Sequence, residues 1–398
     1  MRRLLALPLL AILTTTWAAA PAGAEEADEL ATVSFAVTGP METAFDYGTE
    51  RCNTLDLPDA AARAFRDSSG DVHLIATHYL HWASIGSSLN SVTRDCAHMI
   101  YAAGANSNPA TYDNRGWLET FWTEDGDTIH GLVAMDYHPE HYGLTCATSG
   151  DCWYGTTVQA TSTDGGYSFT SPAQGTPRFV AGAPYQFDST LPETLGTFVP
   201  SNIVDGGDGY LYATLSFERR APATDGTCLI RTDDIADPAA WRAWGWSGFT
   251  VQFASPYPTA PSIPSAHECV SVANSLGRPI RSLIKVEGQD LYLAIAHGTA
   301  IVGGVTKTVV RASTSTDLVT WTTPQTVMEL PRYGQFGENC STHPNQERYQ
   351  YPSLLDPEST SINFETTGST AYIYATAITY CKGLDRDLVR WPISITVS

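Results

Sequence analysis

Lysine is almost absent from this 398-residue chain, in which only Lys285, Lys307 and Lys382 occur. Lysine and arginine together number 22 against 42 acidic residues, which gives a formal net charge of −20. Because no run of basic residues occurs, we expect neither a nucleic acid nor a membrane surface as a partner. Charged residues make up only 16% of the chain and hydrophobic residues 43%, so the sequence can form a large core and is not that of a disordered protein.

Long apolar stretches are confined to the N-terminus. Arg2 and Arg3 precede an apolar run over 4–14 that is too short to span a bilayer. Ala22-Gly23-Ala24 matches a small-residue cleavage site. We therefore expect residues 1–24 to be a signal peptide and 25–398 to form a single exported domain. The expected location is extracellular, or periplasmic in a Gram-negative host.

No Cys-x-x-Cys pair occurs among the eight cysteines, so zinc binding by cysteine is not expected. An even number of cysteines in an exported chain indicates disulfides. The sequence does not select one of the 105 pairings that eight cysteines allow, although Cys146 and Cys152 are close enough to staple one loop. We expect no metal centre and no cofactor; a structural calcium ion at 205–209, Asp-Gly-Gly-Asp-Gly, is an alternative to a plain turn there.

Long amphipathic helical patterns are also scarce, and short β-rich runs bounded by turn residues dominate. Five of these runs resemble one another and start 57 to 82 residues apart, over 72–79, 129–137, 211–218, 291–297 and 371–380. After each run an Asp precedes an aromatic residue by a few positions. These pairs are Asp113 and Trp117, Asp164 and Phe169, Asp233 and Trp241, Asp317 and Trp321, and Asp387 and Trp391.

A repeat of this size with about four strands per unit is typical of propeller blades. The sequence therefore predicts an all-β fold, a single five-bladed β-propeller with four-stranded blades. We expect the segment 33–37, Val-Ser-Phe-Ala-Val, to add a strand to the last blade and close the ring. A two-sheet sandwich is the alternative.

Turn motifs in these repeats resemble those of known families. The segment 162–169, Ser-Thr-Asp-Gly-Gly-Tyr-Ser-Phe, resembles the Asp-box of sialidase-type propellers. The segments 315–321 and 387–391 resemble a turn of five-bladed arabinanase- and invertase-type glycosidases, and 58–66 resembles a group of secreted bacterial propeller proteins. Such an Asp accepts backbone hydrogen bonds inside a tight turn, so these motifs indicate the fold rather than the chemistry. We expect Asp164, Asp317 and Asp387 at blade-edge turns.

Blade geometry brings polar side chains together at one end of the channel, where the first strand of each blade begins and the second ends. The set is Asp59, Arg63, His78, Tyr79 and His81 from the first blade, Asp136, Tyr137, His138 and His141 from the second, Ser201, Asn202, Glu218 and Arg219 from the third, Arg281 and His297 from the fourth, and Arg348, Tyr351 and Tyr380 from the fifth.

The resemblance to arabinanase- and invertase-type glycosidases, which use three carboxylates from the first three blades, implies catalytic roles for Asp59, Asp136 and Glu218. It implies Glu218 as general acid and Asp136 as the residue that tunes its pKa. Glycoside cleavage needs one ionised and one protonated carboxyl group. The expected substrate-binding residues are Arg63, His78, Tyr79, His138, Asn202, Arg281, His297 and Tyr351. The histidines at 78, 81, 138 and 141 are an alternative source of the transferred proton.

The sequence thus predicts a secreted glycoside hydrolase acting on an extracellular poly- or oligosaccharide. One alternative is a polysaccharide lyase, in which Arg63 or Arg281 neutralises a uronate and His78 or Tyr79 abstracts its C5 proton. Another is a non-catalytic carbohydrate-binding propeller, with stacking platforms at Trp82, Trp122 and Trp153. We expect a monomer in each case.

Overall fold

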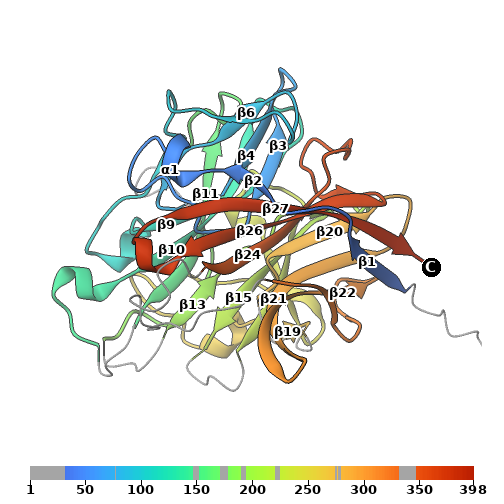
Figure 1. Cartoon of the computed structure of the whole chain (residues 1–398). Coiled ribbons are helices and arrows are strands. Elements are labelled where there is room, and N and C mark those ends of the chain that lie inside the picture. Colours follow the sequence, from blue (N-terminus) through green and yellow to red (C-terminus); the bar gives the residue numbers. More distant parts are fainter. Residues whose placement is uncertain are drawn as a thin grey trace, which may run out of the picture.

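The computed structural model describes residues 32–76, 78–146, 152–170, 178–189, 194–219, 225–273, 276, 279–330 and 347–398, without the side chains of residues 305, 306 and 380. The expected signal peptide, Cys340 and the Tyr380 side chain lie outside this part. The described chain is nearly all β (Figure 1). Its helical turns are short: α1 (Tyr47–Glu50), η1 (Pro109–Thr111), η2 (Pro139–Tyr142), η4 (Pro238–Ala240), η5 (Pro264–His267) and η7 (Tyr380–Lys382). No helix in these ranges is long and apolar enough to cross a membrane.

Most of the strands fall into five groups that follow one another along the chain. Group 1 comprises β3 (Arg63–Arg66), β4 (Val72–Ile75), β6 (Ser84–Gly86) and β7 (Thr93–Arg94), and group 2 comprises β9 (Gly116–Thr123), β10 (Ile129–Tyr137), β11 (Tyr154–Ser162) and β12 (Phe179–Gly182). Group 3 comprises β13 (Leu195–Phe198), β14 (Val204–Asp205), β15 (Leu211–Glu218), β16 (Gly226–Thr232), β17 (Arg242–Gly245), β18 (Gly248–Val251) and β19 (Ser271–Val272).

Groups 4 and 5 follow the same antiparallel pattern. Group 4 comprises β20 (Ser282–Val286), β21 (Tyr292–Val302), β22 (Val305–Ser315) and β23 (Gln325–Glu329), with β25 (Thr366–Thr367) parallel to β20. Group 5 comprises β24 (Glu347–Leu355), β26 (Thr370–Thr379), β27 (Arg386–Val397), β1 (Val33–Val37) and β2 (Glu42–Phe45). A separate pair joins β5 (Leu80–His81) to β8 (Tyr101–Ala102).

All five similar runs are strands, as the sequence predicts. They are β4, β10, β15, β21 and β26, and each pairs with a strand on both sides. The bounds of β10 and β15 are the predicted ones. The first run ends early, since β4 stops at Ile75 and does not continue to residue 79.

Successive residues of the inner strands enter different cores, because side chains alternate between the two faces of a strand. Phe65 and Ile75 pack against group 2, while Ala64 and Leu74 pack against group 5. The same alternation holds elsewhere, so that five clusters fill the spaces between groups 1 and 2, 2 and 3, 3 and 4, 4 and 5, and 5 and 1. Both faces are buried, which explains the nearly continuous apolar runs.

The N-terminal strand closes the last group, as predicted for 33–37. β1 pairs antiparallel with β27 from Val33 opposite Val397 to Val37 opposite Ile393. Figure 1 shows the dark blue β1 beside the red β27. Val33 is buried in the cluster between groups 4 and 5.

Groups 2 and 3 differ from separate four-stranded sheets, because they merge into one eleven-stranded sheet. The junction is a short parallel pair between β11 and β13, with Tyr154 opposite Leu195 and Gly155 opposite Gly196.

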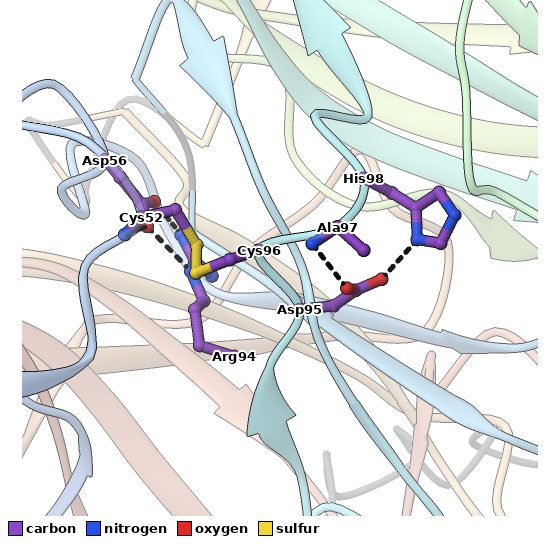
Figure 2. Close-up of a disulfide and its surroundings, with 7 residues drawn as sticks. All are labelled: Cys52, Asp56, Arg94, Asp95, Cys96, Ala97 and His98. Atoms are coloured by element: carbon purple, nitrogen blue, oxygen red, sulfur yellow. Dashed lines mark hydrogen bonds and ion pairs between the residues drawn. A yellow bond between two sulfur atoms is a disulfide. The ribbon is translucent and has the colours of Figure 1, made fainter.

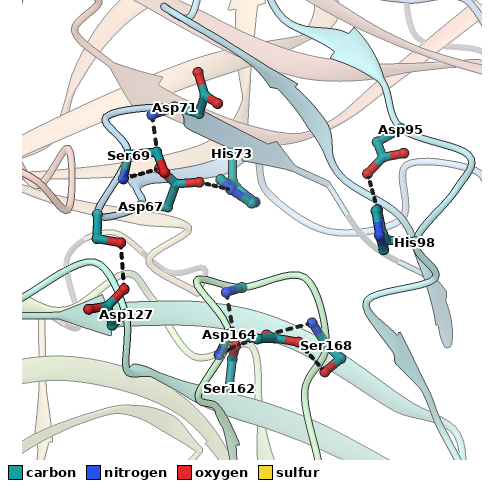
Figure 3. A network of polar contacts seen from close by, with 12 residues as sticks. Asp67, Ser69, Asp71, His73, Asp95, His98, Asp127, Ser162, Asp164 and Ser168 are labelled. Carbon is teal, nitrogen blue, oxygen red and sulfur yellow. Dashed lines mark hydrogen bonds and ion pairs between the residues drawn. The ribbon is translucent and has the colours of Figure 1, made fainter.

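Two of the three expected turn aspartates hold their turns, and Figure 3 shows the turn at Asp164. Asp164 Oδ1 accepts the backbone N–H of Ser168 at 2.9 Å and the Ser162 hydroxyl at 2.6 Å. Asp317 Oδ1 likewise accepts the backbone N–H of Val319 at 2.8 Å. The expectation for Asp387 is wrong: this residue pairs within strand β27, and its carboxylate accepts the backbone N–H of Tyr47 instead.

The described cysteines are disulfide-bonded, as expected for an exported chain. The bonds are Cys52–Cys96, Cys146–Cys152 and Cys228–Cys269, and Cys381 is disulfide-bonded as well. The Cys146–Cys152 bond is the loop staple that the spacing predicts.

Shortening a buried side chain of strand β1 tests how much this strand contributes to the stability of the fold. We expect Val33→Ala to lower the free energy of unfolding by roughly 1–3 kcal/mol, because it opens a cavity in a shared core. The neighbouring Ser34→Ala, at an exposed position of the same strand, should change it by less than about 0.5 kcal/mol. Urea denaturation of both variants measures the difference, and equal effects would contradict a structural role for β1.

Candidate active site

Asp59 lies where groups 1, 2 and 5 meet. It directly follows Pro58, ahead of β3. Its carboxylate accepts the Tyr351 hydroxyl at 3.0 Å and Trp117 Nε1 at 3.3 Å, and it forms an ion pair with Arg386. His78 Nε2 lies 3.8 Å from Asp59 Oδ2. Both carboxylate oxygens are therefore engaged by groups from distant parts of the chain.

The segment before Asp59 is anchored by a disulfide and a buried ion pair (Figure 2). Cys52–Cys96 joins it to the end of group 1. Asp56, which is 1% exposed, accepts the Cys52 backbone N–H at 2.9 Å and Arg94 Nε at 3.0 Å. These contacts hold the backbone in place three residues before Asp59.

A fourth acidic residue, Glu119 on β9, belongs to this site and is not among the candidates from the sequence. It is only 8% exposed, and its Oε2 has no hydrogen-bond partner among the described residues. Burial raises the pKa of Glu119 to about 7; Arg281 and Arg63 oppose the shift, and Asp59 adds to it. Glu119 is the one charged residue of strand β9, Gly-Trp-Leu-Glu-Thr-Phe-Trp-Thr, which is buried throughout. A charged residue within such an apolar stretch is the only feature of the sequence that indicates a functional role for it.

Arg63 braces the structure beside this carboxyl group. It is 3% exposed, and its Nη2 donates to the carbonyls of Arg281 at 2.6 Å and Pro200 at 3.4 Å. Burial lowers the pKa of Arg63 to about 10, which leaves it charged at neutral pH. These bonds tie group 1 to groups 3 and 4. Arg63, which the sequence analysis expects to bind substrate, therefore has a structural role.

Asp136 and Glu218 lie in register on one sheet. Asp136 pairs with Gly155, Gly155 with Gly196, and Gly196 with Glu218. The two acids thus stand on the same line across β10, β11, β13 and β15. Between them are two glycines, which place no side chain in the gap.

The acidic residues influence one another. Burial and, after it, the Glu119 carboxyl group raise the pKa of Asp136 to about 8, with smaller contributions from Asp59 and Glu218 and opposition from Arg115. Asp136 Oδ1 has no hydrogen-bond partner in the described part of the chain. At neutral pH Asp136 therefore holds a proton that it can donate.

Backbone strain accompanies the site. Tyr351 has φ of 56° and Arg115 φ of 47°, in the left-handed region that these residues rarely adopt. Tyr351 donates to Asp59, and Arg115 acts on Asp136. Such strain costs about 1–3 kcal/mol per residue and often concentrates at functional sites.

His78 and His138 are neutral at pH 7. Burial lowers the pKa of His78 to about 4 and that of His138 to about 4. The His78 ring lies tilted at 4.1 Å from the Tyr79 ring, and the His138 ring lies 4.3 Å from that of Trp153. His138 Nδ1 is 2.9 Å from Glu140 Oε1. Within the described ranges, His138, Glu140 and His141 offer ligand atoms within 4.8 Å of one another and could hold a metal ion. Arg115 Nη1 also contacts His141 Nε2 there.

Other predicted residues have structural contacts. Asn202 is buried, and its carboxamide pairs with both the N–H and the carbonyl of Leu283, which joins groups 3 and 4. Asp205 and Asp208 accept backbone N–H groups inside the turn between β14 and β15. The proposed stacking platforms Trp82 and Trp122 are both 7% exposed and therefore offer no open face.

A polar cavity of about 1040 Å³ opens beside Glu218. Arg281 and His297, both expected at the site, line it together with Glu218 and Arg219. Thr194 donates its hydroxyl to Glu218. The cavity therefore places one of the predicted catalytic carboxylates in contact with space large enough for a ligand.

Comparisons with known proteins add a likeness of fold. No family model and no curated protein matches the sequence. Similar solved structures include an α-L-arabinanase from Cellvibrio cellulosa (11% identity, TM-score 0.45, 84% of this chain and 90% of that one) and a GH62 hydrolase in complex with xylotriose (10%, 0.45, 90% and 97%). A protein from Dyadobacter fermentans is similar at 9% identity, with a TM-score of 0.42 over 89% of this chain and 99% of that one. The resemblance to arabinanase-type glycosidases is confirmed as a likeness, and at these values it carries no argument about activity.

The raised pKa of Glu119 has a measurable consequence for stability. Between pH 4.5 and 7 the folded protein holds a proton that the unfolded chain has released, so stability falls as the pH rises through this window. We expect Glu119→Gln to reduce that fall by an amount on the order of 1–3 kcal/mol, measured by urea denaturation at both pH values. The exposed Glu124→Gln should retain the wild-type slope. An unchanged slope in Glu119→Gln would contradict a protonated, buried carboxyl group.

Proposed function

We propose that this protein is an exported glycoside hydrolase that cleaves an extracellular poly- or oligosaccharide. The observation that carries the proposal is the group of four acidic residues, Asp59, Glu119, Asp136 and Glu218, two of which have pKa values raised to about 7 and 8. Hydrolysis of a glycosidic bond requires a protonated and an ionised carboxyl group on the two sides of that bond. An environment that pushes carboxyl pKa values apart supplies both forms at neutral pH.

Asp136 is the proposed general acid, because its raised pKa keeps it protonated until the pH approaches 8. Glu218 is the proposed carboxylate partner, since it lines the cavity and lies in register with Asp136. Asp59 tunes the pKa of Asp136 while held by Arg386, Tyr351 and Trp117. The resemblance implied Glu218 as the general acid and Asp136 as the residue that tunes its pKa. The present assignment instead makes Asp136 the acid and Asp59 the tuning residue.

A five-bladed propeller is the architecture that we propose for the whole domain, with groups 1 to 5 as its blades. Five core clusters in cyclic order, including one between the last and first groups, support a closed ring. The pairing of β1 with β27 joins the two ends of the chain within one blade. Export is supported by the disulfides, which persist in oxidising compartments.

A polysaccharide lyase is the second candidate, favoured by one observation. His78 is neutral at pH 7, which is the protonation state that a base needs to abstract a C5 proton, and its Nε2 lies 3.8 Å from Asp59 Oδ2. Arg281, which lines the cavity, is the group available to neutralise a uronate. A lyase product carries an unsaturated uronide with strong ultraviolet absorbance, whereas a hydrolase releases reducing ends without it.

Substitution of the two carboxyl groups tests the proposed mechanism. We expect Asp136→Asn and Glu218→Gln each to lower kcat by roughly 10²-fold or more, the scale of a lost general acid or base. Release of reducing ends from a panel of soluble polysaccharides measures this. Asp290→Asn, at an exposed turn between β20 and β21, serves as the matched control and should keep full activity. Full activity in either active-site variant would reject its assigned role.

The pH profile provides an independent check on Asp136. Because a general acid must be protonated, kcat should fall as the pH rises through about 8, the pKa to which burial and Glu119 raise this residue. Glu119→Gln removes a neighbouring negative charge and should move this alkaline limb to lower pH. A limb that stays in place in Glu119→Gln would assign the proton to another group.

A further inference from the structure

Trp246 is far more exposed than any other tryptophan described in the structure. It stands in the turn between β17 and β18 and is 94% exposed. A tryptophan has the largest apolar surface of any side chain and is highly buried on average, so an open indole face is unusual. A single exposed apolar side chain is common on protein surfaces, but Trp246 differs in that it also lines a cavity.

The hairpin that carries Trp246 is held rigidly. Trp244 packs edge-to-face on Phe249 with ring centroids 5.1 Å apart, and Arg231 lies 4.2 Å from the Phe249 ring. The carbonyl of Trp244 accepts the N–H of Val270 at 2.8 Å, next to the Cys228–Cys269 disulfide. Trp246 is thus presented on a fixed support, which lowers the entropy cost of binding a ligand.

Trp246 lines the same cavity as Glu218. The cavity is lined mostly by hydroxyl, carboxylate and guanidinium groups, with Ser216, Thr227, Ser265, Ser271, Glu268 and Arg219 among them. Its volume of about 1040 Å³ is at the upper end of the range for sites that hold a whole drug-sized ligand, and it exceeds what one sugar ring needs. Many hydrogen-bonding groups together with one open aromatic face suit a polyhydroxylated ring with an apolar side.

We infer that Trp246 is a stacking residue for a sugar unit away from the cleaved bond, so that the substrate is a polymer rather than a disaccharide. This inference rests on the proposed function, because it takes Glu218 at the other part of the cavity as the reacting end. The ring of one unit lies on the indole, and the chain continues through the cavity to Glu218. A substrate of several units uses both contacts, whereas a short one reaches only the carboxylates.

Affinity electrophoresis measures this contact without turnover. Native gels contain arabinan, arabinoxylan, galactan, levan or dextran, and the full-length Asp136→Asn protein serves as the parent so that the polymer stays intact. We expect Trp246→Ala to weaken binding of the retained polysaccharide by roughly threefold to tenfold, the scale of one lost aromatic contact. Trp246→Phe should recover most of the binding. Ile301→Ala, at a 78% exposed hairpin position that does not line the cavity, should match the parent.

Kinetics in the otherwise wild-type protein give a second readout. Trp246→Ala should raise KM for the polymer more than for its trisaccharide, and kcat should change less than KM. Equal changes in KM for polymer and trisaccharide would overturn the inference.

The outcomes separate this inference from the proposed function. Cleavage of a polysaccharide with unaltered binding in Trp246→Ala overturns the inference and leaves the hydrolase proposal standing. Binding that depends on Trp246 with neither reducing ends nor unsaturated products supports a glycan contact and overturns the enzyme. If Trp246→Ala instead abolishes a dimer seen by sedimentation and leaves glycan binding unaltered, a second copy of the chain covers the indole and the inference is wrong.

Discussion

The close approach of β11 and β13 is the contact on which the arrangement of the site depends. Gly155 and Gly196 face each other in this parallel pair, and a Cβ added at Gly196 would collide with the carbonyl oxygen of Gly155. Gly196 also has φ of 121°, which strains any other residue. Because the strands meet this closely, the register from Asp136 to Glu218 is continuous across four strands. A wider junction would separate the two carboxyl groups.

The same convergence creates an electrostatic conflict that the fold resolves with cations. Burying several carboxyl groups together favours protonation, because desolvation and mutual repulsion both disfavour the charged form. Arg63 and Arg281 oppose this effect for Glu119, Arg115 opposes it for Asp136, and Arg386 forms an ion pair with Asp59. Arg63 is at the same time a brace between groups through its bonds to backbone carbonyls. Arg63 therefore both offsets the negative charge of the site and holds neighbouring groups together. A change at this residue affects the site and the packing at once.

The sequence predicts the strands better than the site, for physical reasons. Strand period and turn chemistry are local, so the runs at 129–137 and 211–218, the closing segment 33–37 and the turns at Asp164 and Asp317 could be recognised. Whether a side chain is open or buried is decided by distant segments. Nothing local distinguishes Trp122, which packs into a core, from the open Trp246, or shows that the Asn202 amide pairs with Leu283. The apolar neighbours of Glu119 make its strand resemble pure core, so the sequence does not indicate this residue as a site residue. Asp387 differs from the expected turn residue because strand β27 begins before it, at Arg386.

The pairing of β1 with β27 also governs the order in which the molecule can assemble. Val33 and Val397 lie at nearly opposite ends of the chain, so their contact encloses almost the whole sequence and carries a large loop-closure entropy. During synthesis β1 emerges long before β27 exists. It remains unpaired with β27 until the last residues leave the ribosome. Groups 1 to 4 can form meanwhile, because most of their pairs join strands that are neighbours along the chain. The final closure is then a slow, non-local step that cannot begin before the C-terminal strand is available.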